Sequence, residues 1–353
     1  MAQAANAAWQ PGQALFVGFE GTQCPPPLRE LVAQGRVGGV ILFSRNIQDA
    51  TQLRGLVASL RDAAPADAPL TIAIDQEGGR VQRLRAPWTE WPPMRRVGER
   101  AQLQSTAALA RALSLELREL GIGLDFAPVV DVDSNPANPI IGDRSFGRDA
   151  AVVSRHAAAF VDAMQAEGVA CCAKHFPGHG DTTLDSHLAL PKLAHDLDRL
   201  FEVELPPFQA AIAAGVASIM TAHVVFEAID KTRPASFAPD VIALLRERLG
   251  YDKLVCSDDL EMKAVADHWQ PREMVDAALG ADVDVLLVCR RFDFVTEVLA
   301  RIERVPDATI ERALARVVAF KRAFPGAAPA SEPQGPPYPE HEALAQRLVR
   351  GEA

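Results

Sequence analysis

Residues 169–187 read VACCAKHFPGHGDTTLDSH, a short apolar run followed by a loop that is dense in titratable side chains. The run 169–172 is typical of a buried strand. The residues from 174 to 187 then include three histidines, two aspartates, one lysine and two glycines. Loops on rigid scaffolds commonly carry catalytic and binding groups, and a loop that only joins a strand to a helix does not need so many of them. A polar surface loop is the alternative interpretation, and we expect a functional loop.

The chain on both sides of this stretch alternates strand-like and helix-like segments. The strand-like runs are 14–19, 37–43, 70–75, 124–130, 169–175, 217–222, 253–257 and 283–288. The helix-like segments are 28–33, 50–63, 102–120, 150–167, 200–214, 239–249, 272–279, 293–302 and 309–324. The strands are near-continuous apolar runs, which indicates a parallel sheet covered on both faces. We therefore predict an α/β fold, a single-domain (β/α)8 TIM barrel over residues 1–324. A doubly wound open sheet is the competitor, and no Gly-x-Gly-x-x-Gly follows the first strand to support it.

Residues 325–353 differ in composition from the barrel region. Residues 325–340 are rich in Pro and Ala, which predicts an extended tail, and residues 341–349 predict a short terminal helix.

Overall composition bounds the function classes. Hydrophobic residues make up 48% of the 353 residues, and the net charge is −10. Because no basic run is present, we expect no nucleic-acid partner. We expect no signal peptide and no membrane partner either, since the start of the chain lacks an apolar h-region and no apolar run reaches ~18 residues. The five cysteines are an odd number, and four lie in or beside apparent strands, which favours reduced thiols and a cytoplasmic location. We expect a monomer.

Charged side chains follow at least five of the predicted strands. The segments are IDQEGGRVQR at 74–83, DVD at 131–133 with GDRSF at 142–146, Lys174 with His175, His223, and SDDLEM at 257–262. In a barrel the carboxyl ends of the strands meet at one rim, where active sites lie. A cup of carboxylates, arginines, lysine and histidines offers many hydrogen-bond donors and acceptors, as a small-molecule sugar substrate requires.

Two reaction classes fit such a cup. Glycoside hydrolysis through a covalent intermediate needs a carboxylate nucleophile and an acid/base group, and Asp258 at the end of the seventh strand suits the first role. Metal-assisted hydrolysis is the alternative, with ligands drawn from the loop. Those candidate ligands are His175, His179, Asp181, Asp185 and His187. They crowd one glycine-containing loop instead of several rigid strand ends, so we expect no metal and no organic cofactor.

At this level of detail the motifs resemble those of a known family. The segment KHFPGHGDTTLDSH at 174–187 is similar to the signature of family 3 β-N-acetylglucosaminidases. The segments at 74–83, 142–146 and 257–262 resemble three further motifs of that family in the same order, and the likeness extends from about residue 15 to residue 324. It implies a retaining exo-glycosidase that removes terminal non-reducing β-linked N-acetylglucosamine. The resemblance is to the single-domain bacterial branch, which implies cytoplasmic peptidoglycan recycling and a 1,6-anhydro-N-acetylmuramyl muropeptide as substrate.

The resemblance also implies residue roles. Asp258 corresponds to the nucleophile that forms a glycosyl-aspartate, His187 to the acid/base, and Asp185 to its partner. The residues that correspond to sugar contacts are Asp75, Arg83, Arg144, Lys174 and His175. A histidine suits the acid/base role because imidazole both donates and accepts protons near neutral pH. Two other functions stay open: a phosphorylase that uses the same site, since a histidine tolerates an attacking phosphate, and a sugar-binding protein whose site is inactive.

Several neighbouring residues have a structural interpretation. We expect Asp259 to be a structural or helix-capping acid, Glu77 to be an ion-pair partner, and His223 to lie either in the site or behind it. His179 and Asp181 are an alternative dyad that spacing alone does not exclude.

For the residues outside the rim we expect ordinary packing or exposure. Cys171, Cys172 and Cys256 are expected to pack in the core. His156 and His268 are expected at the surface.

Overall fold

The protein forms a closed barrel of eight parallel strands. The structure, a computed structural model, describes residues 9–99, 102–186, 189–326 and 334–352. In chain order the barrel strands are β1 (Leu15–Val17), β2 (Gly39–Leu42), β3 (Thr71–Ile74), β6 (Leu124–Asp125), β7 (Ala170–Phe176), β9 (Ser218–Thr221), β11 (Leu254–Asp259) and β12 (Val285–Val288). Each strand pairs with its neighbour along the chain, and β1 pairs with β12 to close the barrel. This confirms the predicted (β/α)8 fold.

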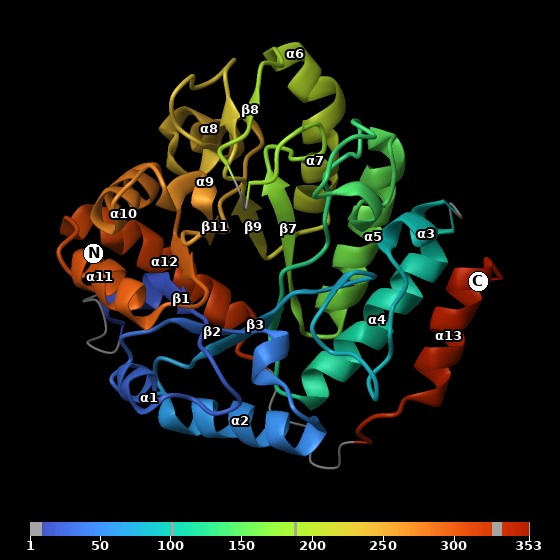
Figure 1. The fold of residues 1–353 in the computed structure, drawn as a ribbon, viewed down its shortest axis with the longest axis horizontal. Coiled ribbons are helices and arrows are strands. Elements are labelled where there is room, and N and C mark those ends of the chain that lie inside the picture. The colour runs from blue at the N-terminus through green and yellow to red at the C-terminus, as the bar shows by residue number, and fades with distance from the viewer. Residues whose placement is uncertain (1–8, 100–101, 187–188, 327–333, 353) are drawn as a thin grey trace.

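Helices surround the barrel (Figure 1). The longer ones are α1 (Pro26–Ala33), α2 (Ala50–Ala63), α4 (Leu103–Glu119), α5 (Ala150–Ala166), α7 (Leu205–Ala213), α10 (Pro271–Gly280), α11 (Phe292–Ile302), α12 (Asp307–Ala323) and α13 (Pro339–Arg350). The five-residue α8 (Pro239–Ala243) continues into a π-helical stretch over Leu244–Arg248. Three short helices lie in the connections: α3 (Met94–Gly98), α6 (Leu197–Arg199) and α9 (Lys263–Ala266). The connections also hold two small sheets, β4 (Gln76–Gly78) with β5 (Val81–Gln82), and β8 (Lys192–Leu193) with β10 (Val225–Phe226).

Both faces of the barrel sheet are buried, which explains the continuous apolar runs in the sequence. Alternate residues of each strand enter two different clusters. In β7, Cys172 packs inside the barrel with Phe16 and Met220, whereas Cys171 packs between the sheet and the helices. All five cysteines are free thiols, and the Sγ atoms of Cys172 and Cys256 lie 3.9 Å apart.

Two predicted segments are less regular than expected. The fourth strand has only the two residues of β6 in the ladder, because Pro128 lacks the N–H group that a central strand requires. Beyond it, Val129 forms one isolated bridge with Lys174. In the predicted helix 200–214, a π-helical stretch over Leu200–Glu204 precedes α7, whose first turn contains Pro206 and Pro207.

The expectation that His156 lies at the surface is wrong. Its side chain is fully buried, and its Nδ1 lies 2.6 Å from the Thr106 hydroxyl of α4. The ring also stacks on Phe146, with 5.4 Å between centroids. His156 shares the buried face of α5 with Val153 and Phe160, at the spacing of an amphipathic helix. Burial lowers its pKa to about 4, so the ring is neutral at neutral pH.

The last described helix packs on the outside of the barrel. Helix α13 lies beside α4 and α3, at the edge of the molecule (Figure 1). Tyr338 donates a 2.5 Å hydrogen bond to Glu119 of α4, and His341 lies 2.8 Å from Glu116 of the same helix. Leu348 of α13 is fully buried.

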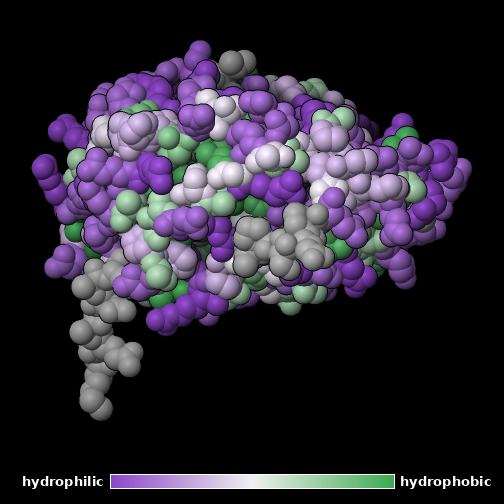
Figure 2. Space-filling view, turned by 90° about the horizontal axis from the view of Figure 1, so that it is seen from below, coloured by the Kyte–Doolittle hydropathy of each residue, from purple (hydrophilic) through white to green (hydrophobic). Residues whose placement is uncertain are grey.

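Polar residues dominate the face shown in Figure 2, and hydrophobic residues appear there in small areas between them. Among the described residues, the large hydrophobic side chains that are well exposed are Leu115, Leu184, Leu197, Phe292 and Val349. No helix within the described ranges combines the length and the apolar character needed to cross a membrane.

Candidate active site

A cavity of about 300 Å³ lies at the carboxyl ends of the barrel strands. The predicted site residues that line it are Asp75, Arg83, Arg144, Lys174, His175 and Asp258. They come from the ends of β3, β7 and β11 and from the loops that follow β3 and β6. Phe43, Phe126 and Met220 provide apolar parts of the wall. A concave site with a few convergent polar groups on an apolar wall is typical of small-molecule binding.

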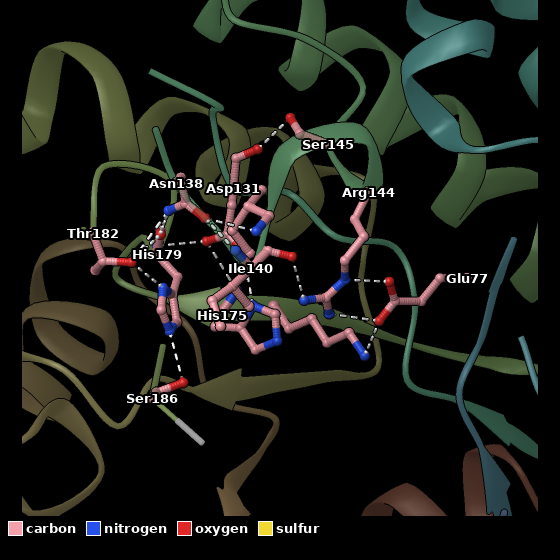
Figure 3. A network of polar contacts seen from close by, with 12 residues as sticks. Glu77, Asp131, Asn138, Ile140, Arg144, Ser145, His175, His179, Thr182 and Ser186 are labelled. Carbon is pink, nitrogen blue, oxygen red and sulfur yellow. Dashed lines mark hydrogen bonds and ion pairs between the residues drawn. The ribbon is translucent and has the colours of Figure 1, made fainter. Parts of the chain in front are cut away.

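A network of ion pairs forms one side of the cavity. Lys174 Nζ lies 2.8 Å from Asp75 Oδ1 and 2.6 Å from Glu77 Oε1. Arg144 donates from Nε and Nη2 to the two oxygens of Glu77 at 2.7 and 2.8 Å (Figure 3). Arg83 Nη2 lies 3.1 Å from Asp75 Oδ2. Glu77, expected as an ion-pair partner, therefore orients both Arg144 and Lys174.

The network keeps its members charged. Burial alone would raise the pKa of Glu77, but Arg144 and Lys174 outweigh burial and lower it to about 2. Burial also opposes ionisation of Asp75, yet Lys174 and Arg83 hold its pKa well below the usual range. For Lys174, burial would lower the pKa, and the carboxylates of Asp75 and Glu77 raise it instead. The side of the cavity is thus a set of fixed charges of both signs.

His175 is held by Asp131, a residue that sequence reasoning did not assign to the site. Its Nδ1 donates to Asp131 Oδ2 at 2.7 Å, and its backbone N–H lies 3.2 Å from both carboxylate oxygens. The Asp131 carbonyl accepts a 2.6 Å hydrogen bond from Ser145. This pairing leaves Nε2 of His175 as the ring nitrogen that can meet a ligand. The position of Asp131 just after the fourth strand was the only signal in the sequence.

Asp258 is the penultimate residue of β11 and is partly buried at the cavity wall. The backbone N–H of Asp259 donates to Asp258 Oδ1 at 2.8 Å, which helps to orient the carboxylate. Asp259 itself accepts hydrogen bonds from the backbone N–H groups of Glu261 and Cys289, so it is structural, as expected. Burial raises the pKa of Asp259 to about 7, and the charges of Glu261 and Asp258 add to this effect.

Asp185 lies in the loop after β7, next to Ser186, which lines the cavity, and His187 lies outside the described residues. The alternative dyad of His179 with Asp181 does not form, because Asp181 Oδ2 pairs with His195 Nε2 at 2.5 Å. Both ring nitrogens of His179 meet hydroxyl groups, those of Thr182 and Ser186. In the described part of the chain, no group of three His, Cys, Asp or Glu side chains is arranged to hold a metal ion.

His223 lies behind the cavity wall. It is fully buried, its Nε2 lies 3.0 Å from the carbonyl oxygen of Asp259, and its Nδ1 meets the Ser236 hydroxyl at 2.9 Å. Burial lowers its pKa, partly opposed by the charge of Asp258. A neutral ring that donates from Nε2 to a carbonyl supports the end of β11 and hence Asp258.

Chemically, the cavity combines a carboxylate on a rigid strand with paired cations and anions that can exchange hydrogen bonds with a hydroxyl-rich ligand. A carboxylate held in this way can act as a nucleophile or as a charge that stabilises a cation.

Comparisons with known proteins agree with this chemistry. The description of the matching family model is the glycosyl hydrolase family 3 N-terminal domain, and the match covers residues 17–320. A β-hexosaminidase of Thiobacillus denitrificans is 39% identical over 310 residues, which are 86% of this chain and 85% of the relative. Beta-hexosaminidase A of Pseudoalteromonas piscicida is 39% identical over 287 residues, and the chain spans about half (48%) of that longer protein.

A solved structure is similar over almost the whole chain. It is a glycoside hydrolase family 3 β-N-acetylglucosaminidase from Paenibacillus sp. strain FPU-7, with a TM-score of 0.92 and 37% identity. The similarity covers 99% of this chain and 69% of that chain. The family match over residues 17–320 includes every segment that lines the cavity.

Proposed function

Since the chain belongs to glycosyl hydrolase family 3, we propose that it is a β-N-acetylhexosaminidase that removes terminal non-reducing β-linked N-acetylglucosamine with retention of configuration. The observation that carries the proposal is the convergence of Asp258 with five predicted sugar contacts on one cavity. A single sugar ring needs a cup of this kind, closed on one side by fixed hydrogen-bonding groups.

In this proposal, Asp258 is the nucleophile. Its position at the end of β11, with a hydrogen bond from the Asp259 N–H, gives it a defined orientation. The carboxylate attacks the anomeric carbon as the bond to the leaving oxygen breaks, which forms a glycosyl-aspartate ester. Phe126 and Met220, which belong to the apolar cluster inside the barrel, form the apolar part of the cavity wall.

The ion-pair network would hold the sugar. Asp75 accepts hydrogen bonds from sugar hydroxyls, while Arg83, Arg144, Lys174 and His175 Nε2 donate to hydroxyl and acetamido oxygens. These donors and acceptors are already fixed by one another, so little rearrangement is needed on binding. This arrangement favours a neutral, hydroxyl-rich ligand.

The acid/base role falls to His187 with Asp185 as its partner, as the family signature implies. His187 donates a proton to the departing oxygen in the first step. In the second step it accepts a proton from the water that attacks the anomeric carbon, and Asp258 leaves as a carboxylate. Asp185 favours the protonated ring in the first step.

The natural substrate that we propose is a 1,6-anhydro-N-acetylmuramyl muropeptide in peptidoglycan recycling, and the location that we propose is the cytoplasm. The resemblance to the single-domain bacterial branch of the family supports the substrate. The free thiols of Cys172 and Cys256, whose sulfur atoms are 3.9 Å apart without a disulfide, fit a reducing compartment. A monomer remains our expectation.

The test uses 4-nitrophenyl β-N-acetylglucosaminide with the wild type, Asp258→Asn and Asp259→Asn. We expect Asp258→Asn to lose at least roughly a thousandfold in kcat/KM. Asp259→Asn is the matched control, because its amide oxygen can still accept from the same two backbone N–H groups, and it should keep most activity. Equal losses of kcat/KM in both variants would refute Asp258 as the nucleophile. A wild type without activity would refute the proposed function.

Two further measurements separate the mechanisms. Proton NMR of the first product should show the β-anomer, and a 5-fluoro sugar analogue should label the peptide that contains Asp258. A mechanism assisted by the substrate's acetamido group also retains configuration but leaves no such label. Activity that requires phosphate would identify a phosphorylase instead, and loss of activity with a chelator would indicate a metal enzyme.

A further inference from the structure

His179 is a buried histidine beside the cavity to which the proposed chemistry gives no role. Only 1% of its surface is exposed. Its Nδ1 lies 2.8 Å from the Thr182 hydroxyl, and its Nε2 lies 3.0 Å from the Ser186 hydroxyl (Figure 3). Burial lowers its pKa to about 4, aided by the charge of His175, so the ring is neutral at neutral pH. A neutral imidazole donates from one nitrogen and accepts at the other.

The surrounding hydrogen bonds indicate which nitrogen carries the proton. The backbone N–H groups of Ile140 and Ile141 donate to Asn138 Oδ1, so the amide nitrogen of Asn138 faces the loop. That nitrogen donates to the His179 carbonyl at 2.8 Å and to Thr182 Oγ1 at 3.2 Å. The Thr182 hydroxyl in turn donates to the His179 carbonyl at 3.1 Å. This arrangement is fully satisfied when Nδ1–H donates to Thr182, which makes Nε2 an acceptor for the Ser186 hydroxyl.

The imidazole is anchored to the rigid part of the barrel. The backbone N–H of His179 donates to Asp131 Oδ1 at 2.7 Å, and Asp131 also holds His175. The next residue, Gly180, lies so close to the Val132 carbonyl that a Cβ atom there would be 1.7 Å from the oxygen. The ring therefore has a fixed position relative to the end of β7.

Ser186 connects this anchor to the strand that carries Asp258. Its hydroxyl meets His179, and its carbonyl accepts a 3.3 Å hydrogen bond from the backbone N–H of Ala264. Ala264 belongs to α9, which follows β11 and Asp258 in the chain. Ser186 is 2% exposed, and in the sequence it stands between Asp185 and His187.

From this geometry we propose that His179 is a positioning residue for the acid/base dyad, acting through Ser186 to hold the Asp185 segment at a fixed place relative to Asp258. The inference rests on the proposed function, because it assigns a task to the loop only if Asp185 and His187 perform acid/base catalysis. His179 itself neither donates nor accepts a proton in the reaction.

The role predicts a specific kinetic defect. Loss of the bond to Ser186 should weaken proton donation to the leaving group but leave the sugar contacts and Asp258 in place. For kcat/KM, which reports the steps up to the glycosyl-enzyme, proton donation matters greatly for an alkoxide leaving group and little for dinitrophenolate. The defect should therefore depend on the leaving group.

The experiment compares His179→Asn, His179→Gln and Ser186→Ala on N,N′-diacetylchitobiose and on 2,4-dinitrophenyl β-N-acetylglucosaminide. Asparagine places its amide near the Nδ1 position and loses Ser186, whereas glutamine places its amide near the Nε2 position and can still accept from Ser186. For His179→Asn and Ser186→Ala we expect kcat/KM on the disaccharide to fall ~10- to 100-fold, with the aryl substrate within about threefold of wild type. His179→Gln should recover most of the loss, and combining His179→Asn with Ser186→Ala should add little.

The outcomes separate this inference from the proposed function. If the wild type cleaves neither substrate, the proposed function is wrong. If the wild type cleaves both and the variants lose equally on both, His179 serves only stability or sugar binding, and the positioning role is overturned. Glutamine no better than asparagine would also overturn it. Thermal unfolding of each variant identifies losses of activity that come from a poorly folded protein. If His179→Asn is unfolded, the dependence on the leaving group is measured with Ser186→Ala, which is the smallest of the changes.

Discussion

Glu77 and Arg144 form a two-point ion pair in the wall of the cavity, with donor–acceptor distances of 2.7 and 2.8 Å and side chains that are 2% and 10% exposed. The same carboxylate also contacts Lys174 at 2.6 Å. One acidic group therefore fixes two cations that we propose as sugar contacts. An arginine fork paired in this way has little rotational freedom, so the donors that face the cavity are already oriented.

Glu77→Gln should therefore affect stability and substrate binding together. The change removes the ion pair of the buried Arg144 and leaves Lys174 paired with Asp75, so we expect the free energy of unfolding to fall by about 3 kcal/mol. KM for the aryl substrate should rise more than kcat falls, because Arg144 and Lys174 lose their orientation. Urea denaturation and initial rates measure the two effects.

The matched control for Glu77→Gln is Glu90→Gln. Glu90 pairs with Arg85 at 3.5 Å, but both side chains are about half exposed. Exposed pairs contribute about 0–1 kcal/mol, so this variant should resemble wild type. If both variants lose the same stability, burial does not determine the strength of the Glu77 pairs.

The buried carboxyl group of Asp125 should make the free energy of unfolding depend on pH. It is fully buried in β6, its Oδ1 accepts from the Gln76 N–H at 2.9 Å, and burial raises its pKa to about 8 against the backbone bond that lowers it. At a pH between 3.8, the pKa of an unshifted aspartate, and about 8, the pKa of Asp125 in the folded protein, the folded protein holds a proton that the unfolded chain has lost. Stability from this group is therefore full at acidic pH and falls as pH rises through that window, by about 1.4 kcal/mol per unit.

Asp125→Asn removes this dependence, because the amide oxygen still accepts from Gln76 and the group does not ionise. Relative to wild type, the variant should gain about 2–3 kcal/mol in unfolding free energy between pH 5 and pH 7. Urea denaturation of both proteins at the two pH values gives this difference, in which all other titrating groups cancel. Parallel stability curves would show that Asp125 is already ionised in the folded protein.

The sequence alone predicted the barrel and most of the cavity wall because both follow from local patterns. Apolar runs with no alternation indicate a parallel sheet, and in such a sheet the charged residues after each run must meet at one rim. Asp75, Lys174 and Asp258 were found in this way. Their converging geometry needed no knowledge of loop conformation.

The supporting residues could not be predicted because their partners lie far away in sequence. Asp131 holds His175 and His179 across more than 40 residues, and the role of Ser186 depends on the path of a loop. His156 is different, since its spacing with Val153 and Phe160 already put it on the buried face of a helix. The burial of His156 could therefore have been predicted from the sequence, and we expected exposure only because the side chain is polar.

We expect Lys321 to stabilise the end of the barrel that lies opposite the cavity. It is 2% exposed, and its ammonium donates to Gln13 Oε1, the Gly38 carbonyl and the Pro69 carbonyl at 2.6, 2.6 and 2.8 Å. These three residues precede β1, β2 and β3, so one side chain of α12 ties three strand ends together. Burial lowers the pKa of Lys321 to about 7, and in the ammonium form its three N–H donors match the three acceptors.

Lys321→Met keeps the length of the side chain but leaves three buried oxygens without donors. We expect the free energy of unfolding to fall by about 3 kcal/mol or more, measured by urea denaturation, with kcat/KM unchanged where the protein is folded. Arg322→Met is the control. The Arg322 side chain, next to Lys321 in the sequence, is exposed, so this change should alter the free energy of unfolding by about 0.5 kcal/mol or less. A loss no larger than that of the control would contradict the role of Lys321.

Helix α13 supports the last prediction, that the C-terminal segment stabilises the barrel without contributing to catalysis. Glu119 of α4 accepts from the backbone N–H groups of Gln334 and Gly335 and from the Tyr338 hydroxyl, at 3.0, 3.1 and 2.5 Å. Leu348 is fully buried, and the Trp91 ring lies 6.0 Å from the His341 ring. Helix α13 thus covers apolar surface outside α3 and α4, on the far side of those helices from the barrel (Figure 1).

Ending the chain after residue 333 should therefore lower the free energy of unfolding by about 2 kcal/mol or more, since burial of one leucine contributes about 1.5–3 kcal/mol. Ending it after residue 350 is the control, which keeps α13 and should leave stability unchanged. Below the unfolding temperature, kcat/KM on the aryl substrate should be the same in both truncated chains, because α13 contributes no residue to the cavity lining. A truncated chain that is fully stable, or stable but inactive, would show that this segment has a different role.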